Sequence, residues 1–295
     1  MEIAVASGKG GTGKTFITSN LAILFDREDE GAVAVDADVE APDLALALGG
    51  ERRILWKREI WESAKASIDY NLCDGCGKCF DVCAFDAIIF EKGSKPTIIR
   101  EFCEGCTACM KVCPQNAITI EKTRTGQLSA VETLYGINVV TGDLEVGGRN
   151  SGEIVFTARE EAKKLAEKIG KRTILIDCAP GIGCPVVSSL SGADLLLLVV
   201  EPIPQSLQGA KRILKLAESF RLKTYCILNK YDLNEEYSEK IPEELGLEII
   251  GKIPYDESVV ESYTMMRPIV VDSGENPVKT SLINLFENLT KELST

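Results

Sequence analysis

A glycine-rich stretch near the start of the chain constrains the fold more than any other feature. Residues 8–15 read GKGGTGKT and match the pattern G-x-x-x-x-G-K-[S/T]. The segment Glu2–Ala6 before it reads as a strand, and Phe16–Phe25 after it has apolar residues at helical spacing. In this order, backbone N–H groups of the turn can wrap a phosphate, and the helix N-terminus adds favourable partial charge. The stretch therefore predicts a nucleotide phosphate site.

The residue types of this loop have defined roles in such a site. Lys14 would reach the β- and γ-phosphates, and the hydroxyl of Thr15 would bind Mg²⁺. The remaining loop residues would bind the nucleotide through their backbone; they are Gly8, Lys9, Gly10, Gly11, Thr12 and Gly13.

Strand and helix patterns alternate along most of the remaining chain. The predicted strands are residues 32–35, 171–177, 193–200, 223–228 and 248–251, and the predicted helices are residues 158–169, 207–220, 235–245, 257–265 and 278–293. Strands that read as continuous apolar runs are buried on both faces, as in parallel sheets. The pattern predicts an α/β P-loop nucleotide-binding fold, with a mostly parallel sheet covered by helices on both faces.

Charge and composition exclude several classes of function. The 295 residues carry a formal net charge of −12 and include no histidine. Binding to nucleic acid or anionic lipid requires clustered lysine and arginine, so neither partner is expected. Imidazole metal sites and histidine-assisted nucleophilic catalysis are excluded as well. The N-terminus does not read as a signal peptide, and the longest apolar run, 193–200, is too short to span a bilayer. We therefore expect a cytoplasmic protein.

Eight of the eleven cysteines lie within residues 57–126, where the alternation of strands and helices is interrupted. The segment CDGCGKCFDVCAFDAI (73–88) matches CEGCTACMKVCPQNAI (103–118) at an offset of 30 residues. Each copy has the spacing C-x2-C-x2-C-x3-C of bacterial ferredoxins with two [4Fe–4S] clusters. We predict an inserted α+β domain of bacterial ferredoxin type at 57–126, within an ATPase domain formed by 1–56 and 127–295.

In this spacing, three thiolates of one run hold one cluster and the fourth cysteine binds the other cluster. The first cysteine set is therefore Cys73, Cys76, Cys79 and Cys113, and the second cysteine set is Cys83, Cys103, Cys106 and Cys109. Zinc would favour pairs of C-x2-C, and a chain without a secretory signal disfavours disulfides. Ala84 stands where many ferredoxins carry proline, but this removes no ligand.

The segment KGGTGKT resembles the deviant Walker A motif of the MinD/ParA/Mrp superfamily of P-loop ATPases. The resemblance covers most of the chain outside the insert. It implies that Lys9 reaches across a nucleotide-sandwich dimer to the ATP of the partner chain, and that two chains associate on binding ATP. It also implies slow ATP hydrolysis of the kind used in molecular switches, with Lys9 and Lys14 offsetting charge on the transferring phosphoryl group.

Other segments extend this resemblance. VDADVEAPD (35–43) is similar to the switch I segment of the Mrp branch, which implies that Asp38 positions the attacking water and that Asp36 lies near the Mg²⁺. Asp177 matches the Walker B aspartate that holds Mg²⁺ through water. NKYD (229–232) and IPYDE (253–257) resemble segments around the base, which implies that Asn229 and Pro254 contact the adenine.

Three cysteines lie outside the two sets. Cys226 falls in the apolar segment KTYCILN and reads as a core residue. Cys178 reads as packing, or as a ligand if its side chain turns toward a dimer axis. Cys184 lies in the loop expected to respond to the γ-phosphate, at the position where the related nitrogenase iron protein holds a cluster between two subunits. Packing, a redox thiol and a ligand of a third, bridging cluster all remain open for Cys184.

Three functions follow from these features. The first is an ATPase that couples nucleotide-driven dimer and switch changes to electron transfer from the ferredoxin clusters to a redox partner. The second is an ATP-dependent iron–sulfur carrier that delivers a cluster from Cys184 to an acceptor protein. The third is a positional ATPase of the MinD kind. The C-terminal segment 277–293 is amphipathic but carries only Lys279 and Lys291 as cations, which disfavours a membrane role.

Overall fold

The chain forms two compact units. The computed structural model describes residues 1–28, 31–61, 63–146, 148 and 151–294. The first unit comprises Met1–Arg58, Leu128–Asp143 and Gly152–Thr295, and the second comprises Glu59–Gln127 and Leu144–Ser151. The sequence interpretation had assigned Leu144–Ser151 to the ATPase domain. Within it, Glu145 contacts the second unit: its N–H donates to the carbonyl of Thr125 at 2.9 Å, and its carboxylate pairs with Arg124 at 3.2 Å.

A nine-stranded sheet forms the centre of the first unit, in the order β13-β12-β11-β1-β10-β2-β9-β8-β3. Its strands are β1 Glu2–Ala6, β2 Ala32–Ala37, β3 Glu51–Ile60, β8 Gly126–Thr133, β9 Asn138–Leu144, β10 Thr173–Cys178, β11 Leu195–Val200, β12 Lys223–Asn229 and β13 Ile249–Ile253. The six pairings from β13 through β9 are parallel. The expectation of a mostly parallel sheet is confirmed.

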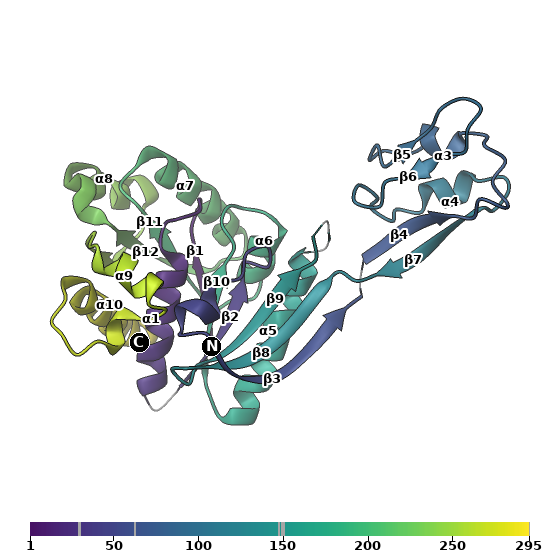
Figure 1. The fold of residues 1–295 in the computed structure, drawn as a ribbon. Helices are drawn as coiled ribbons and strands as arrows, with labels where there is room; N and C mark the ends of the chain where they lie inside the picture. Colours follow the sequence, from purple (N-terminus) through teal and green to yellow (C-terminus); the bar gives the residue numbers. More distant parts are fainter. Residues whose placement is uncertain (29–30, 62, 147, 149–150, 295) are drawn as a thin grey trace. The chain divides into compact units, whose positions relative to one another are not determined.

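Helices cover both faces of this sheet (Figure 1). They are α1 Lys14–Arg27, α2 Leu44–Ala47, α5 Ser151–Ile169, α6 Cys184–Leu190, α7 Pro204–Ser219, α8 Glu235–Leu245, α9 Ser258–Thr264 and α10 Pro277–Leu293. Ile3 and Val5 of β1 belong to one core cluster with buried residues of α1 and α10. Successive strand residues face opposite sides, so Ala4 and Ala6 point to the other face, where α6 and α7 contact β1, β10 and β11.

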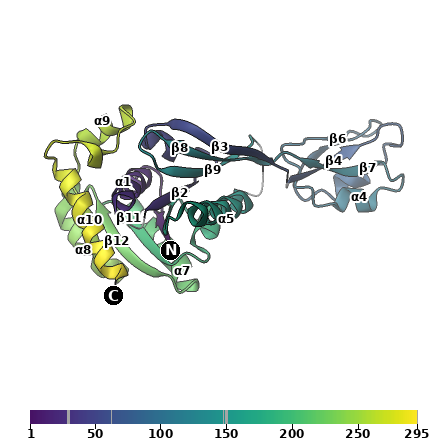
Figure 2. The same cartoon turned by 90° about the horizontal axis from the view of Figure 1, so that it is seen from below.

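Three strands at one edge of the sheet were not expected from the sequence. In the view from below, β3, β8 and β9 lie together at the edge opposite β12 (Figure 2). Most residues of β3 are exposed to solvent. This strand therefore lacks the continuous apolar run by which the other strands were recognised. The chain leaves the first unit along β3 and returns along β8, which are neighbours in the sheet.

The second unit contains a structural repeat that follows the sequence repeat. It consists of β4 Ser63–Ile68, α3 Lys78–Asp81, β5 Ile88–Ile89, β6 Thr97–Ile98, α4 Ala108–Val112 and β7 Ile118–Thr123. Strands β4 and β7 pair antiparallel, as do β5 and β6. The residues before α3 and α4, Gly77 and Thr107, are both left-handed, with φ of 76° and 67°. Residues 30 positions apart therefore adopt corresponding conformations.

Candidate functional site

The phosphate loop lies between β1 and α1, as the sequence predicts. Gly13 has φ of 90°, a backbone conformation that residues other than glycine rarely adopt. A Cβ at this position would lie 2.4 Å from Nδ2 of Asn229. Asn229, at the end of β12, donates from Nδ2 to the carbonyl of Thr12 at 2.7 Å. Gly8 approaches α7 so closely that a Cβ would lie 2.1 Å from the carbonyl carbon of Gly209. Close backbone packing therefore fixes both ends of the loop.

Two aspartates face each other beside this loop. Asp36 of β2 is in register with Asp177 of β10, and each side chain is 1% exposed. Burial, with the nearby Asp177, raises the pKa of Asp36 well above its ordinary range. Burial also raises the pKa of Asp177 to about 7, while the Thr15 hydroxyl and Lys14 oppose that increase. Both carboxylates are therefore in an environment that favours a neutralising proton or cation.

Lys14 and Asp38 lie near the same carboxylates. Lys14 is buried, and its ammonium lowers the pKa of both Asp177 and Asp38. Asp38 is half-buried just after β2, and burial raises its pKa overall. The N–H of Asp38 donates to Oδ1 of Asp36 at 3.2 Å. The residues predicted to act on the phosphates thus meet at the carboxyl ends of β1, β2 and β10.

The sequence interpretation missed two side chains near the phosphate loop. Asp43 hydrogen-bonds to the Thr15 hydroxyl and raises the pKa of Asp177. The ring of Tyr263 from α9 lies 6.3 Å from that of Phe16, and burial and the nearby Asp177 raise the pKa of its hydroxyl. Asp43 stands within the quoted switch-like segment and could have been found there. Tyr263 has no local sequence signal, because it arrives from a distant helix.

Lys9 binds a carboxylate of its own chain. Its Nζ lies 3.2 Å from Oε2 of Glu201, and Nζ of Lys230 lies 2.6 Å from Oε1 of the same residue. Glu201 is buried at the end of β11, and the sequence interpretation did not identify it. A carboxylate shared by two lysines holds Lys9 beside the loop. An approach of Lys9 to another chain would require breaking this ion pair.

A cavity of about 270 Å³ lies beside the loop, on the side of β12 and α9. Its lining residues include Asn229 and Pro254, which were predicted to contact the base, and also Tyr255, Val260 and Tyr263. Aromatic and aliphatic walls with one amide suit a flat heterocycle. The structure thus brings the two predicted base-contacting residues into one cavity next to the phosphate loop.

The donor set beside the loop fits Mg²⁺ bound together with a nucleotide. Among the residues described, no group of three cysteine, aspartate or glutamate side chains could hold a metal ion by itself. Mg²⁺ usually takes one or two carboxylates and completes its shell with water and substrate phosphates. Thr15, Asp36 and Asp177 supply a hydroxyl and buried carboxylates of this kind, and the buried hydroxyl of Thr12 has no partner.

The cysteines of the second unit gather in its interior. Cys83, Cys103, Cys106 and Cys109 line one small cavity, which Phe85 and Ala66 also line. Cys79, Cys83, Cys103, Cys109 and Cys113 belong to one buried or partly buried cluster. Cys73 and Cys109 are the nearby thiols that raise the pKa of Cys79, after the larger effect of burial. The second cysteine set thus has residues of both runs around one cavity.

Backbone N–H groups point at two of these sulfurs. The N–H groups of Ala66 and Gly105 each donate to Sγ of Cys103 at 3.4 Å. The N–H of Ala117 donates to Sγ of Cys113 at 3.3 Å. Such bonds stabilise the anionic thiolate that binds metal.

The three remaining cysteines differ in exposure. Cys226 is buried in β12, and burial raises the pKa of its thiol to about 12, as expected for a core residue. Cys178 is fully buried in β10, with its pKa raised by burial to about 12, and its thiol donates to the carbonyl of Ile176. This burial favours packing for Cys178 over the bridging role that the sequence left open. Cys184 is exposed at the start of α6.

A buried arginine fixes the end of α6. The guanidinium of Arg159, on α5, lies 2.9 Å from Oε1 of Glu2 and also donates to the carbonyls of Ser188 and Ser191. The arginine therefore joins β1, α5 and the segment that carries Cys184.

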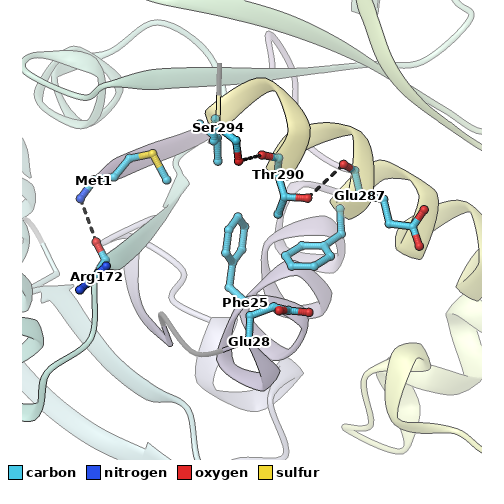
Figure 3. Close-up of a pocket in the computed structure, with 9 residues that line it drawn as sticks. Met1, Phe25, Glu28, Arg172, Glu287, Thr290 and Ser294 are labelled. Atoms are coloured by element: carbon cyan, nitrogen blue, oxygen red, sulfur yellow. Dashed lines mark hydrogen bonds between the residues drawn. The ribbon is translucent and has the colours of Figure 1, made fainter.

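A larger cavity, of about 680 Å³, lies at the opposite end of the sheet from the phosphate loop (Figure 3). Phe25 and Phe286 form its apolar wall. Two of its polar groups are engaged: the Met1 ammonium donates to the carbonyl of Arg172, and Thr290 donates to the carbonyl of Glu287. None of the motif residues lies in this cavity, and we assign it no function.

The loop, the buried lysine, the paired carboxylates and the base cavity define a P-loop nucleotide-binding protein. The family described as the CobQ/CobB/MinD/ParA nucleotide binding domain matches residues 3–269. The chain belongs to this family of nucleotide-binding proteins.

Relatives extend over nearly the whole chain. The uncharacterized protein MJ0578 of Methanocaldococcus jannaschii is 36% identical over 293 residues, which is 98% of this chain and 96% of the relative. The uncharacterized ATP-binding protein MJ0823 of the same organism is 32% identical over 280 residues, which is 92% of each. Such matches include the part of the chain that carries the cysteines.

Solved structures share the fold. The MinD cell division protein of Aquifex aeolicus matches with a TM-score of 0.61 and 22% identity, covering 98% of this chain and 96% of its own. The septum site-determining protein MinD of Pyrococcus horikoshii, complexed with Mg-ADP, matches with a TM-score of 0.60 and 19% identity, covering 99% and 96%. None of the described helices combines the length and the apolar character needed to cross a membrane.

Proposed function

We propose that this protein is an ATPase that carries two [4Fe–4S] clusters and couples its nucleotide cycle to electron transfer from them. The observation that carries the proposal is the cavity lined by Cys83, Cys103, Cys106 and Cys109. Three of these cysteines come from one run and the fourth from the other, which is the division of ligands in two-cluster ferredoxins. In a cube each thiolate binds a different iron atom, so the four sulfurs lie farther apart than the ligands of a single ion. A cube is therefore compatible with the finding that no three described cysteine, aspartate or glutamate side chains could hold one metal ion.

The repeated backbone supports a second cluster in the first cysteine set. Gly75 and Gly105 occupy corresponding places: a Cβ would meet the carbonyl of Ser94 at 2.8 Å and that of Ala64 at 2.3 Å, respectively. Asp86 and Asn116, which follow the fourth cysteine of each run by three residues, are both left-handed, with φ of 49° and 50°. Because both loops have this geometry, the arguments for the second set apply to the first.

The nucleotide site would supply the driving reaction. In the proposal, Lys14 neutralises the β- and γ-phosphates, and Thr15, Asp36 and Asp177 hold Mg²⁺ directly or through water. Asp38 orients the attacking water from its position just after β2. The raised pKa values of Asp36 and Asp177 support this assignment, because Mg²⁺ would replace the proton that burial favours.

We also propose that two chains associate when ATP binds, with Lys9 exchanging Glu201 of its own chain for the nucleotide of its partner. Glu201 would keep a partner after this exchange, because Nζ of Lys230 lies 2.6 Å from its Oε1. The clusters would supply single electrons, and the recipient would be a redox protein that docks on the second unit.

Iron content tests the proposal most directly. Anaerobically prepared protein should contain about eight irons per chain, the content of two cubes. Cys106→Ser should lose about half of this iron, and so should Cys76→Ser. Cys226→Ser is the matched control, because Cys226 lies in the core of the other unit. The iron content of this variant should equal that of wild type. Iron-free protein that still hydrolyses ATP would contradict the cluster proposal and leave the ATPase intact.

One observation favours a second candidate, an iron–sulfur carrier that uses Cys184. This thiol is exposed at the start of α6, in the segment that follows Asp177. A carrier would hold a labile excess of iron that is lost in Cys184→Ser and is transferable to an apo-acceptor protein. Equal iron in wild type and Cys184→Ser, with cluster reduction dependent on ATP turnover, would favour electron transfer.

The third candidate, a positional ATPase, is supported only by the resemblance to MinD proteins. The apolar side of α10, including Leu282, Leu285 and Leu289, is buried against the sheet and α1. That face is therefore engaged in the core. ATP-dependent binding to anionic liposomes would support this candidate.

A further inference from the structure

The two cysteine sets are related by the repeat, yet their surroundings differ in charge. Residues 30 positions apart correspond, so Lys65 of β4 corresponds to Lys95. Lys65 is 6% exposed, and its ammonium donates to the carbonyl of Cys103 at 2.8 Å. Lys95 is exposed, and its ammonium donates to the carbonyl of Tyr70. One set therefore has a buried cation against a ligand residue, whereas the corresponding cation of the other set is in water.

The repeat also differs in a hydrogen bond to sulfur. The N–H of Ala66 donates to Sγ of Cys103 at 3.4 Å. The corresponding residue near the first set is Pro96, which has no N–H to donate to Cys73. The first set therefore lacks a backbone hydrogen-bond donor to sulfur that the second set has.

The cysteines of the two sets have similar solvent exposure. Three of the four corresponding pairs of cysteines have the same exposure: Cys76 and Cys106 are exposed, Cys79 and Cys109 are buried, and Cys83 and Cys113 are half-buried. Only Cys103, which is buried, differs from Cys73, which is half-buried. Burial strengthens the effect of a fixed charge, because the local dielectric constant is low.

A polar cavity beside Lys65 is also lined by Arg100 and Arg124, together with Glu101 and Glu145. Both arginines are paired with carboxylates: Arg100 with Glu121, and Arg124 with Glu59 and Glu145. The ammonium of Lys65 instead contacts a carbonyl of the ligand residue Cys103. A buried cation at this place and an N–H bond to sulfur both stabilise the extra negative charge that a cluster gains on reduction.

We propose that Lys65 and the N–H of Ala66 give the second cysteine set a higher reduction potential than the first, so that an electron taken up by the unit settles at the second set. This inference rests on the proposed function, since it requires clusters in both sets. The exchange moves one electron: the first set is oxidised and the second is reduced, while no bond forms or breaks and no proton moves. The initial electron comes from a one-electron reductant, which is dithionite in the test.

The test is a potentiometric titration of the anaerobic full-length protein, followed by electron paramagnetic resonance. Cys76→Ser and Cys106→Ser assign each transition to its set, and the set containing Cys106 should have the higher potential. We expect Lys65→Met to change the equilibrium constant for electron transfer between the two sets about tenfold in favour of the first set. For a one-electron couple, this is a change of 59 mV in the difference between the two potentials. Lys65→Arg should restore the wild-type difference, because it keeps the positive charge.

Three further variants separate the effect of charge from that of hydrogen bonding and from loss of structure. Lys95→Met is the matched control, and it should shift neither potential, because that ammonium is exposed and donates to a carbonyl of Tyr70 and not of a cysteine. Ala66→Pro, which copies the residue at the corresponding position, should lower the potential of the second set. Pro96→Ala should raise that of the first set by restoring a donor.

The outcomes distinguish this inference from the proposed function. If wild type lacks iron for two clusters, both fail. If both clusters are present but have equal potentials, or if Lys65→Met and Lys95→Met have equal effects, only this inference is overturned.

Discussion

Replacement of Asp177 by asparagine should stabilise the Mg²⁺-free protein while removing its response to Mg²⁺ and ATP. Burial raises the pKa of Asp177 to about 7 in the folded chain, from an ordinary value of 3.8. Folding therefore favours the protonated carboxyl. The stability that this group contributes is fully present below its unfolded pKa and is lost as the pH rises through about 7.

The size of the effect follows from these two pKa values. At 1.36 kcal/mol for each pH unit, the cost of ionising this carboxyl group reduces the free energy of unfolding by about 2 kcal/mol at pH 5 and about 4 kcal/mol at pH 8. Asparagine has nearly the same shape, can still accept from the Thr18 hydroxyl 3.4 Å away, and carries no charge. Asp177→Asn should therefore exceed wild type in stability, by an amount that grows from pH 5 to pH 8.

Urea unfolding in the presence of a chelator, at several pH values, measures this difference. Glu218→Gln on α7 is the matched control, because water already solvates that exposed carboxylate. Saturating Mg²⁺ and ATP, at a hundred times the dissociation constant, should add about 2.7 kcal/mol to wild type and much less to the variant. A difference between wild type and variant that stays constant from pH 5 to pH 8 would refute the argument from burial.

Two further predictions concern packing. Arg159→Met should lower the free energy of unfolding by about 3 kcal/mol in urea titrations, because it leaves buried Glu2 with the partly exposed Lys163 as its ion partner and removes the donor to the carbonyls of Ser188 and Ser191. The exposed Arg58, paired with Glu161, is the control, and Arg58→Met should cost less than about 1 kcal/mol; equal losses would contradict this account. Gly8→Ala should push the phosphate loop away from α7, which should weaken ATP binding and lower the free energy of unfolding by about 1–3 kcal/mol. Gly10→Ala is the control. Its Cβ would lie 4.0 Å from the nearest neighbour, so the melting temperature should not change.

The features that the sequence could predict are those encoded within a few residues. The strand Glu2–Ala6, the glycine-rich turn and the helix after it form where the pattern places them. The parallel sheet followed from apolar runs that are buried on both faces. Strand β3 was missed because most of its residues are exposed, so that neither an apolar run nor a strict alternation marks it.

Contacts between distant residues had no such local signal. Glu201 lies at the end of a strand that reads only as apolar, and its pairing with Lys9 and Lys230 depends on the order of β11, β1 and β12 in the sheet. Tyr263 reaches the phosphate loop from α9 across the chain. Sheet order and helix packing determine such pairs, and one sequence does not encode them in any fixed spacing.

The cysteine region shows the same division within one unit. The sequence by itself determined the spacing of the cysteines, the repeat at 30 residues and the absence of an N–H at Pro96, because these are properties of residue order and chemistry. Only the tertiary structure decided that Lys65 is buried against Cys103 while Lys95 is exposed to solvent. The two lysines are identical in the sequence repeat, and their difference arises because β4 pairs with the six-residue strand β7, whereas β5 and β6 form a two-residue pairing.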